Sequence, residues 1–114
     1  MKISHIWLYV RDTDVSLRFF RDVLGLEVAE TFPHHALFQA GDVLLGVHSE
    51  EGERRVHPGS TVLIFNVTDI DATYMVLREK GVVFDGPIRD EHYGRIVSFH
   101  DPDGYPFEIV QEPR

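Results

Sequence analysis

The chain has 114 residues, 43% of them hydrophobic, which predicts a single folded domain over residues 1–114 rather than a disordered chain. Acidic residues outnumber basic ones by 19 to 11, and the net charge of −8 opposes binding to phosphate backbones and anionic membranes. We therefore expect no nucleic-acid partner and no membrane partner, whereas cationic ligands are favoured at long range. The absence of cysteine excludes disulfides, thiolate zinc sites and a cysteine nucleophile, so a metal would need His, carboxylates or water.

The first residues carry no sign of a targeting segment. MKISHIWLYV contains His, Trp and Tyr and lacks a small-residue cleavage site. No apolar run approaches the ~20 residues of a membrane-spanning helix. We therefore expect a cytoplasmic protein.

The first half of the chain begins with a strand followed by a helix. HIWLYVRDTDVSLRFFRDVLGLEV predicts a strand ending at Val10, a helix capped by Asp12 or Asp14, a helix end at Gly25 and then a new strand. This new strand is LEVAET, and two further short strands are indicated by HALFQA and DVLLGVHS. The order of elements in this half is β-α-β-β-β.

The second half repeats this plan. VLIFNVTDIDATYMVLREKGVVF predicts a strand ending at Val67, a helix capped by Asp69, a helix end at Gly81 and a strand from Val82. The three strands predicted after the helix are GVVF, which contains Val82, then GRIVSFH and YPFEIVQ, separated by Gly, Pro and Asp turns. We assign module one to residues 1–49, an exposed linker to 50–60 and module two to 61–114. The predicted fold is α+β, with two β-α-β-β-β modules that form a curved, cup-shaped mixed sheet with the helices on its outer face.

Strand parity predicts which side chains line the cup. Aliphatic side chains in alternate positions suit packing on the helices, which leaves the intervening residues on the opposite face. These are His5, Trp7, Tyr9, Leu44, Gly46, His48, Val62, Ile64, Asn66 and Glu108. Aromatic walls with a few polar groups are typical of a small-molecule site, and an ionised Glu108 there needs a partner.

Two stretches resemble a known family. HIWLYVRDTDVSLRFFRDVLGLEV is similar to the opening strand and helix of the vicinal oxygen chelate superfamily, and HYGRIVSFHDPDGYPFEIVQ is similar to its closing Asp-Pro-Asp-Gly turn and Glu-bearing strand. This superfamily includes glyoxalase I, extradiol dioxygenases, fosfomycin-resistance thiol transferases and bleomycin-resistance proteins. The resemblance implies four metal-ligand positions. His5 and Glu108 match the ligand types, whereas Gly46 and Val62 occupy the other two positions.

The resemblance leaves several roles open for His5 and Glu108. They could bind one divalent ion (nickel, manganese, zinc or iron), with His48, His92, His100, substrate oxygens or waters completing the sphere. They could equally be an ion pair left from a metal-binding ancestor. In a third alternative, Glu108 or His5 is a metal-free general base. Among these, Glu108 is the expected catalytic residue.

Other side chains are candidates for contact with the ligand or for the core. Trp7 and Tyr9 either form a stacking wall or fill the floor of the cup. His92 lies in a stretch that resembles a ligand-bordering loop, and Arg95 either binds an anionic group or is a surface residue. We expect Phe19, Phe20 and Phe38 to be core residues. His34 and His35 are expected to lie exposed in a turn, and His57 is expected to be solvated. DPDG is expected to form a tight turn.

Three functions remain open. The first is a metal-dependent enzyme with isomerase or lyase, thiol-transfer or ring-opening chemistry. The alternative is a metal-free protein that sequesters a drug or metabolite, as the resemblance to the bleomycin-resistance branch implies. The third is a structural or regulatory homodimer, and the resemblance implies a homodimer in any case.

Overall fold

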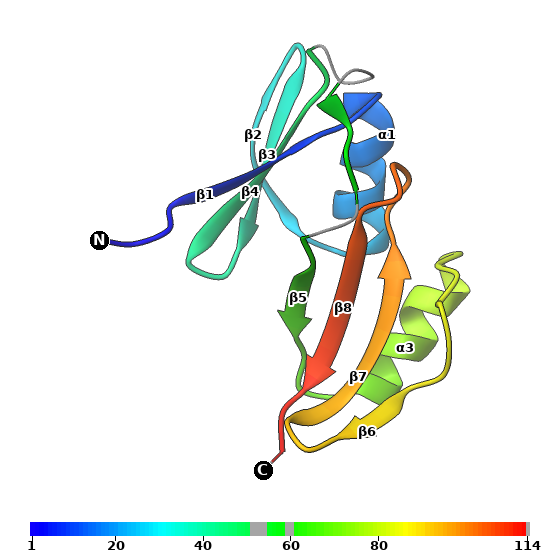
Figure 1. Cartoon of the computed structure of the whole chain (residues 1–114). Coiled ribbons are helices and arrows are strands. Elements are labelled where there is room, and N and C mark those ends of the chain that lie inside the picture. Colours follow the sequence, from blue (N-terminus) through cyan, green and yellow to red (C-terminus); the bar gives the residue numbers. More distant parts are fainter. Residues whose placement is uncertain (51–54, 59–60, 114) are drawn as a thin grey trace. The chain divides into compact units, whose positions relative to one another are not determined.

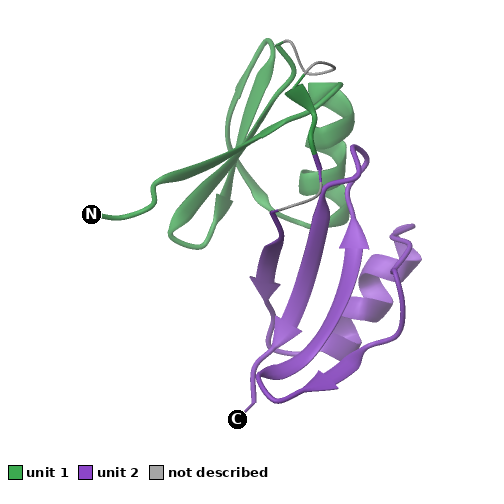
Figure 2. Ribbon diagram, in the orientation of Figure 1, with its two compact units in different colours: residues 1–57 green, residues 58–114 purple. Residues whose placement is uncertain are grey.

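The computed structural model describes residues 1–50, 55–58 and 61–113, within two compact units, Met1–His57 and Pro58–Arg114 (Figure 2). Each unit contains a mixed four-stranded sheet and a helical segment, so the chain is α+β with two βαβββ-like modules (Figure 1). The fold class predicted from the sequence is therefore confirmed. Most of the expected linker lies outside the described residues, and in its described part Val56 is buried whereas His57 is exposed. In the described ranges, no helix has the length and apolar character needed to cross a membrane.

Unit 1 contains a parallel and two antiparallel strand pairs. The elements are β1 (His5–Tyr9), α1 (Thr13–Arg18), η1 (Phe19–Val23), β2 (Glu27–Phe32), β3 (His35–Ala40) and β4 (Val43–His48). The strand order is β1-β4-β3-β2, with β1 parallel to β4. The α1 helix begins at Asp12, whose carboxylate accepts hydrogen bonds from the backbone N–H groups of Asp14 and Val15. Of the two expected caps, Asp12 is thus the one used.

Unit 2 repeats the topology. Its elements are β5 (Leu63–Asn66), α3 (Ile70–Glu79), β6 (Arg89–Glu91), β7 (Gly94–His100) and β8 (Pro106–Gln111), with strand order β5-β8-β7-β6. Asp69 caps α3, as predicted, by accepting from the N–H of Ala72. Gly81 follows the helix with a φ of +96°, a conformation that suits glycine at a helix end.

The sequence predicted a strand at GVVF, and this prediction is wrong. The N–H of Val82 donates to the carbonyl of Leu77, so this residue completes the end of α3. Val83 is 82% exposed, and only Phe84 makes an isolated bridge, with Phe99. Instead, β6 supplies the fourth strand of the sheet, after a bend at Asp85 and Gly86.

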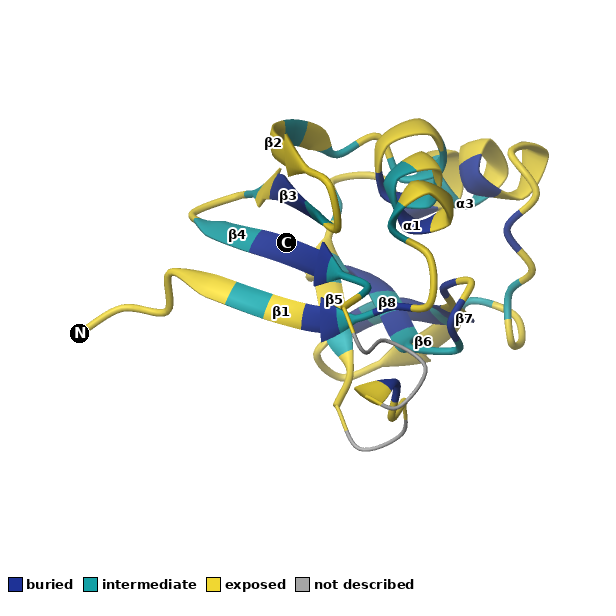
Figure 3. Ribbon diagram, turned by 90° about the horizontal axis from the view of Figure 1, so that it is seen from above, coloured by how far each residue is buried: buried dark blue, intermediate teal, exposed yellow. Residues whose placement is uncertain are grey.

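The alternation of faces agrees with strand parity in both units. In unit 1 the side chains buried beneath the helical segment are Leu8, Val10, Leu45 and Val47, and Figure 3 shows the alternation along β1. In unit 2 the buried face of β8 presents Phe107 and Ile109. Phe20 and Phe38 are fully buried, as expected, and Phe19 is half-buried. The opposite face of each sheet carries Trp7, Tyr9 and His48 in unit 1 and Glu108 in unit 2.

The DPDG segment is the tight turn that the sequence predicts. One carboxylate oxygen of Asp101 accepts hydrogen bonds from the N–H groups of Asp103 and Tyr105, while its other oxygen is buried without a partner. Burial raises the pKa of the Asp101 carboxyl to about 6, against the lowering effect of the N–H donors of Tyr105, Asp103 and Gly104. This carboxyl is therefore a buried group whose charged form is disfavoured.

Candidate functional site

An open pocket of about 430 Å³ lies on the uncovered face of the sheet in unit 1. Strand register places its side chains in two adjacent rows that cross β1, β4, β3 and β2. The lining residues are Trp7, Tyr9, Phe32, His35, Leu37 and His48. Among these described residues none carries a carboxylate.

The rings of the pocket contact one another edge to face. The ring centroid of His48 lies 4.3 Å from that of Tyr9, 5.3 Å from that of Trp7 and 5.2 Å from that of His35. Such edge-to-face pairs are favourable because the positive edge of one ring meets the negative face of another. The guanidinium of Arg55 lies over the Tyr9 ring, 4.8 Å from its centroid, and occupies that face with a cation.

The indole of Trp7 takes the space that a side chain at Gly46 would fill. A Cβ atom built on Gly46 would lie 2.6 Å from Cε3 and Cζ3 of Trp7 and 2.9 Å from its Cδ2. Gly46 is the register partner of Trp7 on the parallel neighbour strand and is itself buried. The absence of a side chain at position 46 therefore has a packing reason, namely that the six-membered ring of the indole lies against β4.

His48 is the most unusual polar group of the pocket. Its Nδ1 is buried and has no hydrogen-bond partner. Burial lowers the pKa of His48, the charges of His35 and Arg55 lower it further, and Glu50 opposes the shift. The neutral form of the imidazole is therefore favoured.

Glu108 has its partners inside unit 2. It lies on β8 opposite Ser98 of β7, whose hydroxyl donates a hydrogen bond of 2.8 Å to Oε2. Nη2 of Arg89 lies 3.6 Å from the same oxygen, and 21% of the Glu108 side chain is exposed. The carboxylate thus has the partners that its position requires without a metal, while its catalytic role stays a prediction.

The residues present do not fit the four-ligand metal site that the resemblance implies. His5 is exposed, with Nδ1 2.8 Å from Oγ of Ser4. Gly46 and Val62 offer no donor side chain, and a ligand at position 46 would collide with Trp7. In the part of the chain that the structure describes, no three His, Asp or Glu side chains are grouped to hold an ion.

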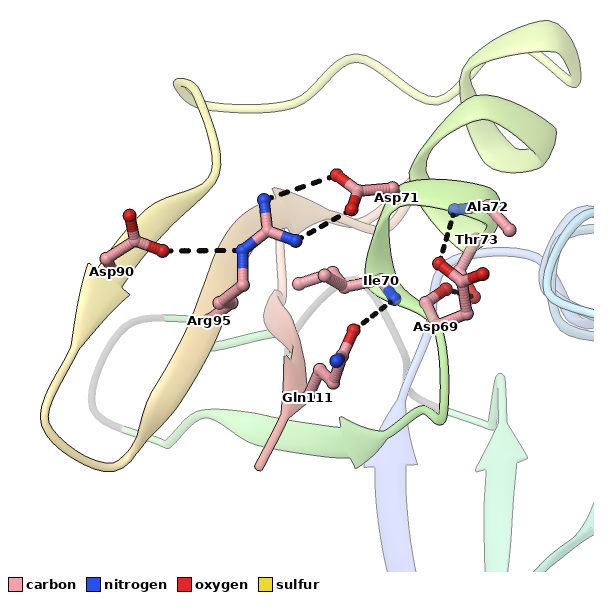
Figure 4. A network of polar contacts seen from close by, with 8 residues as sticks. All are labelled: Asp69, Ile70, Asp71, Ala72, Thr73, Asp90, Arg95 and Gln111. Atoms are coloured by element: carbon pink, nitrogen blue, oxygen red, sulfur yellow. Dashed lines mark hydrogen bonds and ion pairs between the residues drawn. The ribbon is translucent and has the colours of Figure 1, made fainter. Parts of the chain in front are cut away.

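The two other candidate ligand contacts lie in unit 2. His92 is exposed in the β6–β7 turn, with its ring edge-on to Tyr93. The guanidinium of Arg95 binds both carboxylate oxygens of Asp71, at 2.7 and 3.2 Å, and one oxygen of Asp90 at 3.3 Å (Figure 4). These pairs join the first turn of α3 to β6 and β7, so the contacts of Arg95 support a structural role.

Three pocket residues escaped the sequence analysis. Phe32 and Leu37 were not considered, and His35, expected in an exposed turn, is half-buried at the start of β3. Strand parity applied to HALFQA would have found two of them, because His35 and Leu37 alternate along β3 in register with His48 and Gly46. His34, by contrast, is exposed as expected.

Comparisons with known proteins agree on one superfamily. The family model described as Glyoxalase/Bleomycin resistance protein/Dioxygenase superfamily matches residues 2–109. The uncharacterized protein YraH of Bacillus subtilis (strain 168) is 34% identical over 126 residues, covering 97% of this chain and 98% of YraH. Metallothiol transferase FosB of Staphylococcus epidermidis is 29% identical over 112 residues, covering 94% and 81%.

A solved structure shares the fold. TnmS3, an antibiotic binding protein from Streptomyces sp. CB03234, matches with a TM-score of 0.83 over 99% of this chain and 97% of that chain, at 24% identity. At this identity the likeness concerns the fold.

Proposed function

Because the chain belongs to the glyoxalase/bleomycin resistance protein/dioxygenase superfamily, we propose that it binds a small planar molecule in the aromatic pocket of unit 1, without a resident metal. The observation that carries the proposal is the Trp7 ring lying against Gly46, at a position where the family resemblance implies a metal ligand. A pocket with apolar and aromatic walls and few polar groups is suited to such a molecule. The antibiotic-binding function of TnmS3, a protein of the same fold, is of the kind proposed here.

The exposure of Trp7 makes the proposal directly testable. The chain has one tryptophan, and this residue is 43% exposed at the pocket. We expect a saturable change of its fluorescence with at least one compound from a panel of planar drugs and metabolites. By calorimetry, Trp7→Leu should bind that compound about tenfold more weakly, because an aromatic contact is lost. The matched control Tyr93→Leu, an exposed ring in unit 2, should bind it normally, and a Trp7 signal unaffected by the whole panel would reject the proposal.

A metal-dependent enzyme is the second candidate function. It is supported by the similarity to a metallothiol transferase and by the two matching ligand types, His5 and Glu108. In such a protein the ion would supply Lewis-acid chemistry, and these two residues would hold it. Because Gly46 and Val62 offer no donor side chain, the residues present favour binding of a small molecule without a metal.

Metal titration separates the two candidates. We expect untagged protein, freed of metal and titrated with nickel, manganese, zinc and iron(II), to show no stoichiometric binding by calorimetry. Two donors without a third make a weak site. Stoichiometric binding that is lost in both His5→Ala and Glu108→Gln, with the fold intact by circular dichroism, would instead establish the metal site. The expected homodimer and the cytoplasmic location remain predictions.

A further inference from the structure

The buried nitrogen of His48 indicates which form of its ring is present. A buried N–H without an acceptor is costlier and rarer than a buried nitrogen that carries no proton. Nδ1 is buried and unpartnered, whereas Nε2 is not among the buried unpartnered atoms. In the neutral ring we therefore assign the proton to Nε2, which makes His48 a hydrogen-bond donor at the pocket.

The edge-to-face contacts keep this donor in place. The His48 ring contacts Tyr9 and Trp7 of β1 on one side and His35 of β3 on the other. Strand β4 is central in the sheet and is paired on both sides, so its backbone is well supported. A ligand group that reaches His48 therefore meets a donor in a defined position.

The charges around the pocket disfavour a cation. None of the lining residues described is acidic, although the charge of Glu50 acts on His48, and the Tyr9 face that could bind a cation already contacts Arg55. The six-membered ring of Trp7 lies against β4, so the backbone covers part of that ring. The cationic preference expected from the net charge thus has no counterpart among the lining residues.

Resting on the proposed function, the geometry points to a ligand class: an uncharged or anionic aromatic compound whose carbonyl or carboxylate oxygen accepts a hydrogen bond from Nε2–H of His48. The aromatic ring of the ligand packs against Trp7 and Phe32, and the oxygen is directed towards β4. Apolar walls alone would bind different aromatic molecules with similar affinity. The hydrogen bond gives a higher affinity to those that carry an acceptor oxygen.

Four probes that share a benzene ring test this class: benzoate, acetophenone, ethylbenzene and benzyltrimethylammonium. Each is titrated into the untagged full chain while the single Trp7 indole N–H signal is followed by NMR. We expect benzoate and acetophenone to bind about tenfold more tightly than the other two, as one hydrogen bond would give.

Variants of His48 assign the preference to its donor. His48→Phe keeps a ring of similar shape and should lose the preference for oxygen-bearing probes while still binding ethylbenzene. His48→Gln, whose amide N–H replaces Nε2–H, should retain part of the preference and also covers the case in which the Phe variant folds poorly. His57→Phe, which removes an exposed imidazole that is not part of the pocket lining, is the matched control and should behave as the unaltered protein.

The outcomes separate this inference from the proposed function. Equal binding of all four probes, tighter binding of the cation, or a preference that survives in His48→Phe would overturn the ligand class and leave the pocket as a binding site. If none of the four probes and none of the planar drugs and metabolites changes the Trp7 signal, the proposed function itself is wrong. The inferred ligand class is then wrong as well.

Discussion

Replacing Gly46 with alanine should weaken the binding of aromatic ligands at least tenfold and lower the free energy of unfolding by about 1–2 kcal/mol. The added Cβ would lie 2.6–2.9 Å from three carbon atoms of the Trp7 ring, closer than packed carbon atoms approach, so the indole must leave β4. The pocket then loses one wall. Urea denaturation measures the stability, and ligand titration by calorimetry measures the loss of affinity.

A double-mutant cycle shows whether Trp7 is the cause. In a Trp7→Ala background, Gly46→Ala should cost little, because the ring it displaces is already absent. Gly86→Ala is the matched control, since a Cβ at Gly86 meets nothing within 4 Å and its backbone needs no positive φ. The same destabilisation with and without Trp7 would show that the indole does not lie on Gly46.

Asp101 should make the protein less stable as the pH rises from about 4 to above 6. The pKa of its carboxyl is about 6 in the folded protein, against the ordinary value of 3.8 that applies to the unfolded chain, so the folded state binds more protons in this interval. The free energy of unfolding therefore falls with increasing pH, by about 3 kcal/mol in total. Urea denaturation at pH 4, 5, 6 and 7 measures the slope.

Substitutions at Asp101 isolate its contribution from those of the other acidic residues. Asp101→Asn keeps the oxygen that accepts from Asp103 and Tyr105 and should remove this part of the slope. Asp101→Ala removes both the acceptor and the titrating carboxyl, so it should destabilise by about 2 kcal/mol at pH 4, where two N–H groups lose their partner, and by less as the pH rises. Asp42→Asn, at an exposed turn, should keep the slope. An unchanged slope in Asp101→Asn would contradict the assignment.

Local features of the fold were predictable from short stretches of sequence. The caps Asp12 and Asp69 and the helix ends at Gly25 and Gly81 follow from backbone groups that need partners close in the chain. The failed strand at GVVF shows the limit of such reasoning. The N–H of Val82 could donate a hydrogen bond either within a strand or at the end of the preceding helix. In the structure it donates to the carbonyl of Leu77 in α3.

The candidate site was predictable in part. Strand parity correctly placed Trp7, Tyr9 and His48 on one face, because alternation is a property of any extended chain. The same rule was not applied to β3, so His35 and Leu37 were missed. The ion pairs of Arg95 could not be foreseen, since Asp71 and Asp90 come from separate elements that only the folded sheet brings together.

The sequence by itself determined the α+β class, the duplicated order of elements and the faces of the strands, because these depend on periodicity, turn residues and local hydrogen bonding. The resemblance of its two end stretches to known proteins indicated the superfamily. Tertiary structure alone decided what those faces contain. It placed the Trp7 ring over Gly46, left Nδ1 of His48 buried without a partner and supplied Ser98 and Arg89 to Glu108. Each of these contacts joins residues distant in the chain, so its energy depends on how strands pair and on how side chains share the space between them.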